Sequence, residues 1–190
     1  MKLPTVNPHR NHWTIHDVIL LALIAIFFGI IYQAWNYAYY ALAATPLKPY
    51  ANDLTLGVWL MAGPLAAILL KKRNACLIGE LLAGIMEMFI FSSWGVGDII
   101  SGFIQGFGSE LGFALTKYRK FNGIGLFLST ITSTVVTFGW DLFQSGYLSY
   151  PPKMLIELFI IRFLSIGLFA GILVHAIQKL LLRTKVLNHA

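Results

Sequence analysis

The sequence predicts an all-α integral membrane protein, a bundle of six transmembrane helices with both termini in the cytoplasm. Of its 190 residues, 57% are hydrophobic and 12% are charged, and the mean hydropathy is +0.72. That is more apolar surface than a soluble domain of this length could bury. Six segments approach the about 20 mostly apolar residues that cross a bilayer. Lysine and arginine collect on one side of these segments.

The six predicted spans follow one another with short connections. The second contains Pro64, which a membrane helix tolerates when neighbouring groups satisfy the freed carbonyl. The fourth and fifth are rich in glycine, serine and threonine, which suits helices packed inside a bundle. No interior segment has the polar length of a linker, so residues 1–190 are expected to form one domain. The predicted spans are Asp17–Ala44, Thr55–Leu70, Ala75–Ser93, Asp98–Thr116, Gly123–Phe143 and Lys153–Leu182.

The orientation follows from the basic residues. Eleven of the 14 lysines and arginines fall on the side of the termini, whereas only Lys48 and Lys153 fall on the other side. Cytoplasmic loops carry this excess in membrane proteins. We therefore expect a multi-pass protein of the inner (plasma) membrane of a prokaryote. The expected outward loops are Thr45–Leu54, Trp94–Gly97 and Gln144–Pro152.

Several functions are excluded by composition and motifs. The net charge of +6 is concentrated in short clusters at span ends, which argues for a lipid bilayer and against nucleic acid as partner. The single Cys76 allows neither a disulfide nor a cysteine-based zinc site. The five histidines lack ligand spacing, so no metal and no cofactor are expected. No nucleotide-binding loop is present, so the chain alone should not use ATP.

Polar residues lie in the interior of the predicted spans, where an ionised group costs roughly 2.5–3.5 kcal/mol or more and is expected to face a polar interior. Glu80 and Glu87 are seven residues apart, which places them on nearly one helix face about 10 Å from each other. Glu87 lies nearer the outer surface. The polar residues inside the spans are Glu80, Glu87, Gln105, Glu110, Glu157 and Arg162.

These buried charges allow two interpretations. In the structural one, Arg162 pairs with a glutamate on another helix and locks the bundle. In the functional one, four glutamates against one arginine leave negative character, which protonation, hydrogen bonds or a bound cation could meet. The second interpretation makes the bundle interior a cation site, with Glu87 as its leading candidate.

Aromatic residues gather toward the outer ends of the spans. Trp35, Tyr39, Trp59, Trp94 and Trp140 belong to this group. Each could simply anchor the headgroup region. Together, above buried carboxylates, they could also stack on a flat ring and hold positive charge against an aromatic face.

Four motifs together identify a family. Glu80-Leu-Leu-Ala-Gly-Ile-Met-Glu87-Met, Ser93-Trp-Gly-Val-Gly97, Gln105-Gly-Phe-Gly-Ser-Glu110 and Lys117-Tyr-Arg-Lys120 stand in this order. In order, spacing, length and helix count, nearly the whole chain resembles the YkoE type of substrate-binding S component in energy-coupling factor (ECF) vitamin transporters.

This resemblance implies a transporter subunit that captures thiamine or its hydroxymethylpyrimidine precursor from outside. Its partners would be a transmembrane coupling (T) protein and two ATP-hydrolysing subunits. Many S components carry an Ala-xxx-Ala docking motif on the first helix. Here the stretch around Ala22 lacks that strict motif, and Ala25 with Gly29 is its nearest substitute, a small-residue pair that could admit a partner helix.

Two alternatives stay open at this stage. Buried glutamates could serve an intramembrane enzyme as general base or metal ligand, and a scaffold without ligand is a third possibility. For the transport interpretation, the candidate substrate-binding residues are Glu87, Gln105, Trp94, Trp140, Glu157, Glu80, Glu110, Trp35, Tyr39 and Arg162.

Overall fold

The computed structural model describes residues 12–183, and all regular elements within that range are helices. The shorter 3₁₀ and π segments connect or continue the α-helices. The elements are α1 (Ile15–Ala43), η1 (Lys48–Tyr50), α2 (Ala51–Thr55), η2 (Val58–Leu60), α3 (Ala62–Leu70), α4 (Ala75–Phe89), α5 (Val96–Leu115), α6 (Gly123–Gln144), η3 (Tyr147–Ser149), α7 (Pro152–Ile166), η4 (Gly167–Leu173) and α8 (Val174–Arg183).

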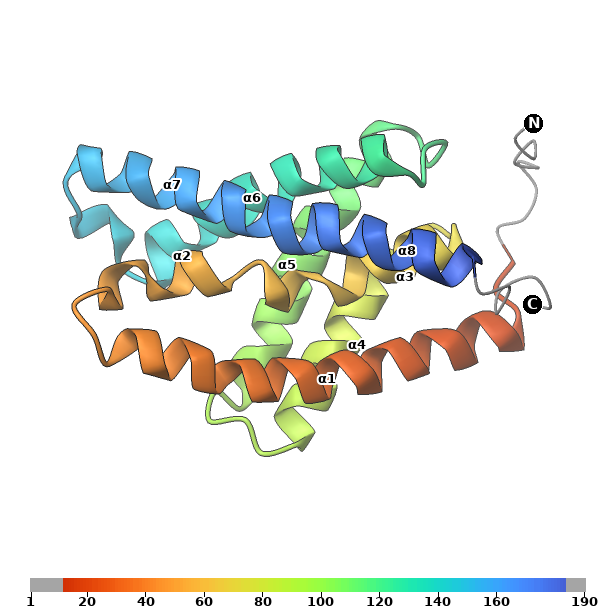
Figure 1. Cartoon of the computed structure of the whole chain (residues 1–190), viewed down its shortest axis with the longest axis horizontal. Helices are drawn as coiled ribbons and strands as arrows, with labels where there is room; N and C mark the ends of the chain where they lie inside the picture. Colours follow the sequence, from red (N-terminus) through yellow and green to blue (C-terminus); the bar gives the residue numbers. More distant parts are fainter. Residues whose placement is uncertain (1–11, 184–190) are drawn as a thin grey trace.

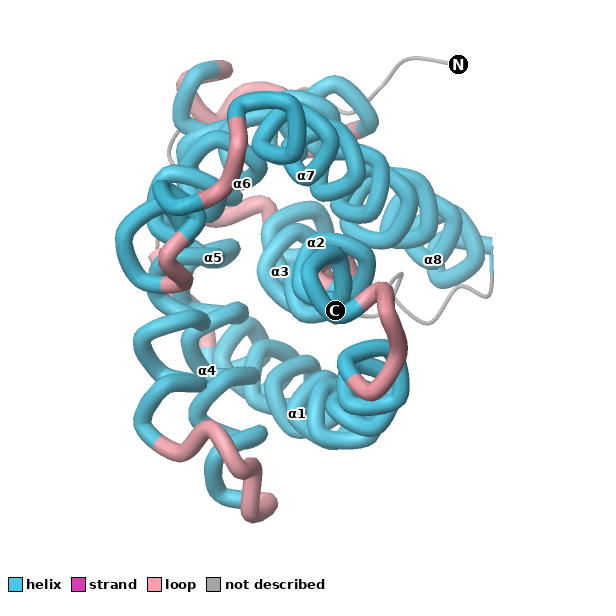
Figure 2. Tube along the Cα trace, turned by 90° about the vertical axis from the view of Figure 1, so that its left-hand side faces the viewer, coloured by secondary structure: helices cyan, strands magenta, loops and turns pink. Residues whose placement is uncertain are grey.

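The helices form a bundle around a central pair. α1 runs along one long side of the molecule, and α7, η4 and α8 follow the opposite side as one continuous rod (Figure 1). α4 and α5 cross the bundle steeply (Figure 1). Viewed along the bundle, α2 and α3 lie in the middle, enclosed by the other helices (Figure 2). The start of α1 and the end of α8 lie at the same end (Figure 1).

Local sequence explains where the outer helices begin. Thr14 and Asp17 form a capping box on α1, in which the Asp17 amide donates to Thr14 Oγ1 at 3.2 Å and the Thr14 amide to Asp17 Oδ2 at 2.8 Å. Asn122 caps α6 by accepting from the Ile124 amide at 3.1 Å. These caps satisfy amide groups that no helical carbonyl can reach.

The second predicted span, Thr55–Leu70, is not one helix. It is divided into the end of α2, the short η2 and α3, in which Pro64 lies in the first turn. Proline fits there because the amides of a first turn have no intrahelical partner. Side chains from two other helices accept hydrogen bonds from the amides at the start of α3. Tyr32 Oη accepts from the Ala62 amide at 2.9 Å, and Glu80 Oε2 accepts from the Gly63 amide at 2.7 Å.

The prediction of an outward loop over Thr45–Leu54 is wrong for most of its length. Residues 48–55 form η1 and α2, and Asp53 within them has no exposed surface. An isolated aspartate beside proline and tyrosine looks like loop sequence. Its buried partner, Arg162, is supplied by a helix more than 100 residues later, which local sequence cannot reveal.

Small residues bring α4, α5 and α6 close together. This agrees with the glycine, serine and threonine content of the fourth and fifth predicted spans. A Cβ atom on Gly106 would lie 2.9 Å from the Leu77 carbonyl oxygen of α4, and one on Gly112 would lie 2.1 Å from the Ser129 amide of α6. Contacts this short leave no room for a side chain, so the glycines permit backbone approach.

Four helical stretches are long and apolar enough to cross a membrane. Lys48–Leu70 is the central stretch. In its most apolar 18-residue segment 89% is buried, whereas the corresponding share for Pro152–Leu181 is 28%. The other two predicted spans correspond to α4 and α5, which carry most of the buried carboxylates. The four stretches are Ile15–Ala43, Lys48–Leu70, Gly123–Gln144 and Pro152–Leu181.

Candidate binding site

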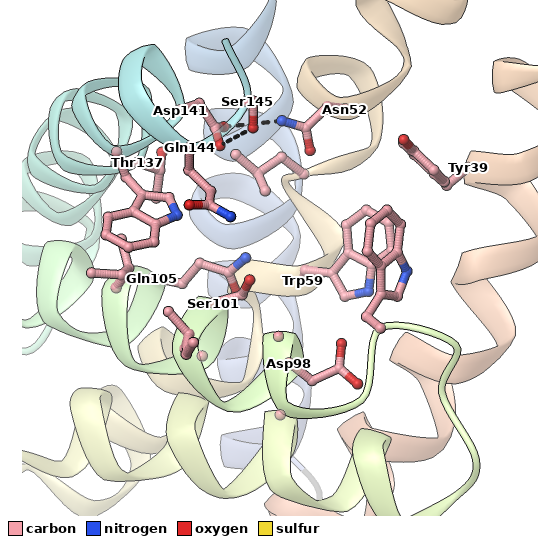
Figure 3. A pocket seen from close by; sticks show the side chains of 18 of the residues that line it. Tyr39, Asn52, Trp59, Asp98, Ser101, Gln105, Thr137, Asp141, Gln144 and Ser145 are labelled. Carbon is pink, nitrogen blue, oxygen red and sulfur yellow. Dashed lines mark hydrogen bonds between the residues drawn. The ribbon is translucent and has the colours of Figure 1, made fainter.

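A cavity of about 660 Å³ opens among the helices and is lined from α1, η1, α2, η2, α4, α5, α6 and η3. Its size falls in the range of ordinary small-molecule sites. In Figure 3, Gln105 and Gln144 extend into the space from neighbouring helices, with Trp59 and Tyr39 across from them. The cavity thus combines amide groups with aromatic faces.

Glu87 forms one end of the cavity and is held by two donors. Its Oε1 accepts from Asn36 Nδ2 at 2.9 Å and from Trp59 Nε1 at 3.3 Å. Trp94 Nε1 in turn donates to Asn36 Oδ1 at 3.2 Å. Both indole N–H groups are therefore engaged by the polar network around Glu87.

Asp98 is the second carboxylate at this end. It lies in the first turn of α5, lines the cavity and is 6% exposed. Its Oδ2 has no hydrogen-bond partner among the described residues. A Cβ on Gly84, one turn before Glu87 in α4, would lie 2.6 Å from the Asp98 carbonyl oxygen. The two carboxylates therefore come from helices in direct contact.

Three aromatic rings pack beside these carboxylates. The Tyr39 ring lies 5.6 Å from the Trp94 ring and 6.1 Å from the Trp59 ring, both at steep angles. The Tyr40 ring is nearly parallel to Trp94 at 6.4 Å, and its hydroxyl hydrogen-bonds Ser93. The rings of Tyr39, Trp59 and Trp94 all border the cavity and present surfaces suited to a flat or cationic group.

The opposite wall is built on Asp141 of α6. Its Oδ2 accepts from Asn52 Nδ2 at 3.0 Å, and its Oδ1 accepts from Ser145 Oγ at 2.8 Å (Figure 3). Gln105 and Trp140 line the cavity as well. This wall offers amide and hydroxyl groups rather than an open carboxylate.

Arg162 lies behind this wall and pairs with two aspartates. Its Nε lies 2.6 Å from Asp53 Oδ1 and its Nη2 lies 2.6 Å from Asp141 Oδ2. Asp53 also accepts from the Tyr147 hydroxyl at 2.7 Å. The expectation that Arg162 pairs with a carboxylate on another helix is confirmed, but the expected glutamate partner is wrong, because both partners are aspartates.

Six of the ten predicted binding residues line the cavity, from different helices and distant parts of the chain. Glu80 does so with both carboxylate oxygens already engaged, Oε1 by Tyr32 Oη at 2.5 Å and Oε2 by the Gly63 amide. The six are Glu87, Gln105, Trp94, Trp140, Glu80 and Tyr39.

The other four predicted binding residues lie outside the cavity lining, and each has a structural partner. Glu110 caps α4, accepting from the amides of Asn74, Cys76 and Leu77. Glu157 accepts from the Tyr50 hydroxyl at 3.0 Å. Trp35 donates to the Thr55 carbonyl at 3.0 Å. Arg162 stands behind Asp141 rather than in the cavity wall.

The predicted docking groove on the first helix is wrong for two of its three residues. Ala25 is 2% exposed, and Gly29 is buried against α4, where an added Cβ would lie 2.5 Å from Met86 Cβ. The small residues thus serve packing within the chain. Ala22 is exposed on the outer side of α1.

Sequence reasoning missed several polar residues of the cavity wall, among them Asn36, Asn52, Asp98 and Asp141. Asp98 and Asp141 stand at the ends of predicted spans, where a charge is ordinary. Asn36 follows Tyr32 by four residues, so both lie on one helix face. A polar residue on that inward face was a usable signal.

The chain is similar to known proteins in both sequence and fold. Residues 16–136 match the family model described as "ABC-type cobalt transport system, permease component". The chain is 31% identical over 176 residues to the protein YkoE of Bacillus subtilis (strain 168), named an HMP/thiamine permease protein, covering 93% of this chain and 88% of that one. It also matches the "Crystal structure of an S-component of ECF transporter" with a TM-score of 0.88 and 31% identity, covering 94% of this chain and 90% of the other.

Proposed function

The chain belongs to the YkoE type of substrate-binding S components of ECF transporters, and from this premise we propose that it captures thiamine or hydroxymethylpyrimidine for uptake. S components are membrane subunits of transporters and not enzymes, so the enzyme alternative falls away. They work with a T protein and ATPase partners. We propose the same partners, with two ATP-hydrolysing subunits, for this chain.

The observation that carries the proposal is the cavity itself. It joins the carboxylate of Glu87 and the amide of Gln105 to the rings of Trp59 and Trp94. Thiamine has a flat aminopyrimidine with donor and acceptor edges and a permanently positive thiazolium ring. Aromatic faces and a carboxylate suit those features.

A cobalt ion is a poorer match to the same lining. The nitrogen ligands of such metals are histidine side chains, and the described residues that line the cavity include no histidine or cysteine. Glu87 Oε1 is already occupied by Asn36 and Trp59, which would compete with a metal for that oxygen. The donor set supports an organic ring.

We also propose that the chain forms one domain of six membrane crossings with both termini cytoplasmic, in the prokaryotic plasma membrane. The common end of α1 and α8 supports an even number of crossings (Figure 1). The basic residues near that end, Lys71, Lys72, Arg73, Lys117, Arg119 and Lys120 among them, support its cytoplasmic side.

Calorimetry on the detergent-purified protein tests the function. The wild type should bind thiamine, hydroxymethylpyrimidine or both, and Glu87→Gln should weaken that binding by more than about tenfold, or about 1.4 kcal/mol. Native mass spectrometry of the purified chain should find a co-purified pyrimidine compound. A wild type that shows neither binding nor a thermal shift with either compound overturns the proposal and favours the ligand-free scaffold.

A further inference from the structure

One oxygen of the cavity wall stands out because nothing satisfies it. Asp98 Oδ2 is buried and has no hydrogen-bond partner among the described residues. An unpartnered buried acceptor is costly and rare in folded proteins. Asp98 lines the cavity and extends toward it beside Trp59 (Figure 3). Asp98 is therefore a buried carboxylate of the cavity lining whose hydrogen-bonding capacity is not used up by the protein.

Glu87, one turn after Gly84 on the neighbouring helix α4, is a second carboxylate that lines the same cavity. The contact between Gly84 and the Asp98 backbone brings together the two helix turns that carry these carboxylates. In residues 12–183 no ion pair reaches either side chain. Two carboxylates in a site of low dielectric repel each other strongly unless one of them takes up a proton or a positive charge lies between or beside them, and a cationic ligand supplies that charge.

The cations nearest the cavity do not fill that role. Arg162 is committed to Asp53 and Asp141 at the opposite wall. Lys48 borders the cavity from η1, where its side chain is exposed. The end of the cavity with Glu87 and Asp98 thus has no paired cation among the described residues, whereas Asp141 at the other end shares Arg162 with Asp53.

The protein holds the two acidic residues differently. Glu87 Oε1 already accepts from Asn36 and Trp59, so the protein itself holds this carboxylate in place. Asp98 retains an unused acceptor. The rings of Tyr39 and Trp94 stand beside the same end, where their faces add attraction for a cation.

We propose that Asp98 is the charge-selecting residue of the cavity, which together with Glu87 holds the positive group of the ligand. This inference rests on the proposed function and narrows it. Of the two candidate ligands, thiamine carries a permanent positive charge on its thiazolium ring, whereas hydroxymethylpyrimidine is neutral near pH 7. Asp98 then favours thiamine over hydroxymethylpyrimidine.

The test is the ratio of the two dissociation constants, measured by calorimetry on full-length protein. The wild type should prefer thiamine by more than about tenfold. Asp98→Asn keeps the shape and removes the charge. It should weaken thiamine binding by more than about tenfold while changing hydroxymethylpyrimidine binding by less than about threefold.

A matched control is Asp17→Asn, which also changes an aspartate in the first turn of a helix but lies in the capping box of α1, away from the cavity. It should leave the ratio unchanged. If Asp98→Asn fails to fold, Asp98→Ser removes the same charge with a smaller side chain, and the same ratio decides. Equal losses for both compounds, or no loss for thiamine, overturn the role of Asp98. A wild type that binds neither compound overturns the proposed function instead.

Discussion

Arg162 of α7 and Asp53 of α2 form an ion pair with an Nε–Oδ1 distance of 2.6 Å, and neither side chain has exposed surface. The same guanidinium reaches Asp141 of α6, which lines the cavity. One buried cation therefore joins α7 to the preceding helix α6 and to α2, which is more than 100 residues away in the sequence. The same ion pair holds the Asp141 carboxylate in place, and Asp141 in turn binds the Asn52 amide at the cavity wall.

Replacing Arg162 should destabilise the protein strongly. Arg162→Met leaves Asp53 buried without a counter-charge, a change that costs about 3–5 kcal/mol in comparable buried pairs. Denaturant unfolding of the purified protein in detergent measures the loss. Lys153→Met, at the exposed start of α7, is the control and should be nearly neutral. A loss below about 1 kcal/mol for Arg162→Met would show that the pair adds little net stability.

The helical class and most helix boundaries could be predicted from the sequence because the length of an apolar segment is a local property. The last five predicted spans begin or end within a few residues of α3, α4, α5, α6 and α8. The break within the second span escaped prediction, because it depends on Tyr32 and Glu80 from other helices satisfying two freed amides. Pro64 was the only local sign of it.

The site was predictable only in part for the same reason. Glu87 and Gln105 were conspicuous as polar residues within apolar sequence, and both line the cavity. Glu110 was equally conspicuous but caps α4. Sequence shows that a buried carboxylate needs a partner and does not show whether the partner is a backbone amide or a ligand. Asp98 was inconspicuous at a span end, although it lines the cavity and has a carboxylate oxygen without a partner among the described residues.

Because Ala25 of α1 is packed inside the protein, its substitution should affect stability rather than partner docking. Ala25 is only 2% exposed, so Ala25→Trp inserts a large side chain into a packed position. Overpacking of this kind typically costs about 1–3 kcal/mol. The melting temperature of the purified protein should therefore fall. Ala22→Trp, on the exposed side of the same helix, should leave it nearly unchanged. A stable Ala25→Trp protein that binds vitamin but fails in uptake would restore Ala25 to a docking surface.

Glu110 should affect stability and not binding. Glu110→Gln weakens a cap that accepts from three amides at the start of α4, with oxygen–nitrogen distances of 2.8, 3.0 and 3.2 Å. Loss of a helix cap typically costs about 0.5–2 kcal/mol. Thermal unfolding should show this decrease while the dissociation constant for thiamine changes by less than about threefold. A tenfold loss of binding in a normally stable variant would return Glu110 to the ligand site.

Trp94 should respond to ligand as a stacking residue. Trp94→Ala removes the ring and the donor to Asn36, whereas Trp94→Phe keeps a smaller ring without the donor. Binding of thiamine should therefore fall most in the alanine variant, by about 0.5–2 kcal/mol from the lost cation–π contact alone, and partly recover with phenylalanine. Ligand should quench tryptophan fluorescence in the wild type. Trp35→Phe, outside the cavity lining, should bind normally. Equal binding by all three variants would assign Trp94 to the membrane interface.

Glu80 and Glu87 lie on one face of α4 and both border the cavity, yet their substitutions should have opposite consequences. Glu80 accepts from Tyr32 Oη and the Gly63 amide on its two oxygens. A glutamine there presents an N–H group to one of these donors, and an unsatisfied buried group costs about 1–3 kcal/mol. Glu80→Gln should therefore lower the unfolding temperature while thiamine binding by the folded fraction changes little.

Glu87→Gln should show the reverse pattern, because the remaining amide oxygen can still accept from Asn36 and Trp59 while the charge facing the cavity is lost. Unfolding temperature and dissociation constant, measured on the same preparations, separate the two residues. If Glu80→Gln weakens binding as strongly as Glu87→Gln at unchanged stability, ligand competes with Tyr32 and Gly63 for Glu80. The site would then extend toward the start of α3, where those two groups meet the carboxylate.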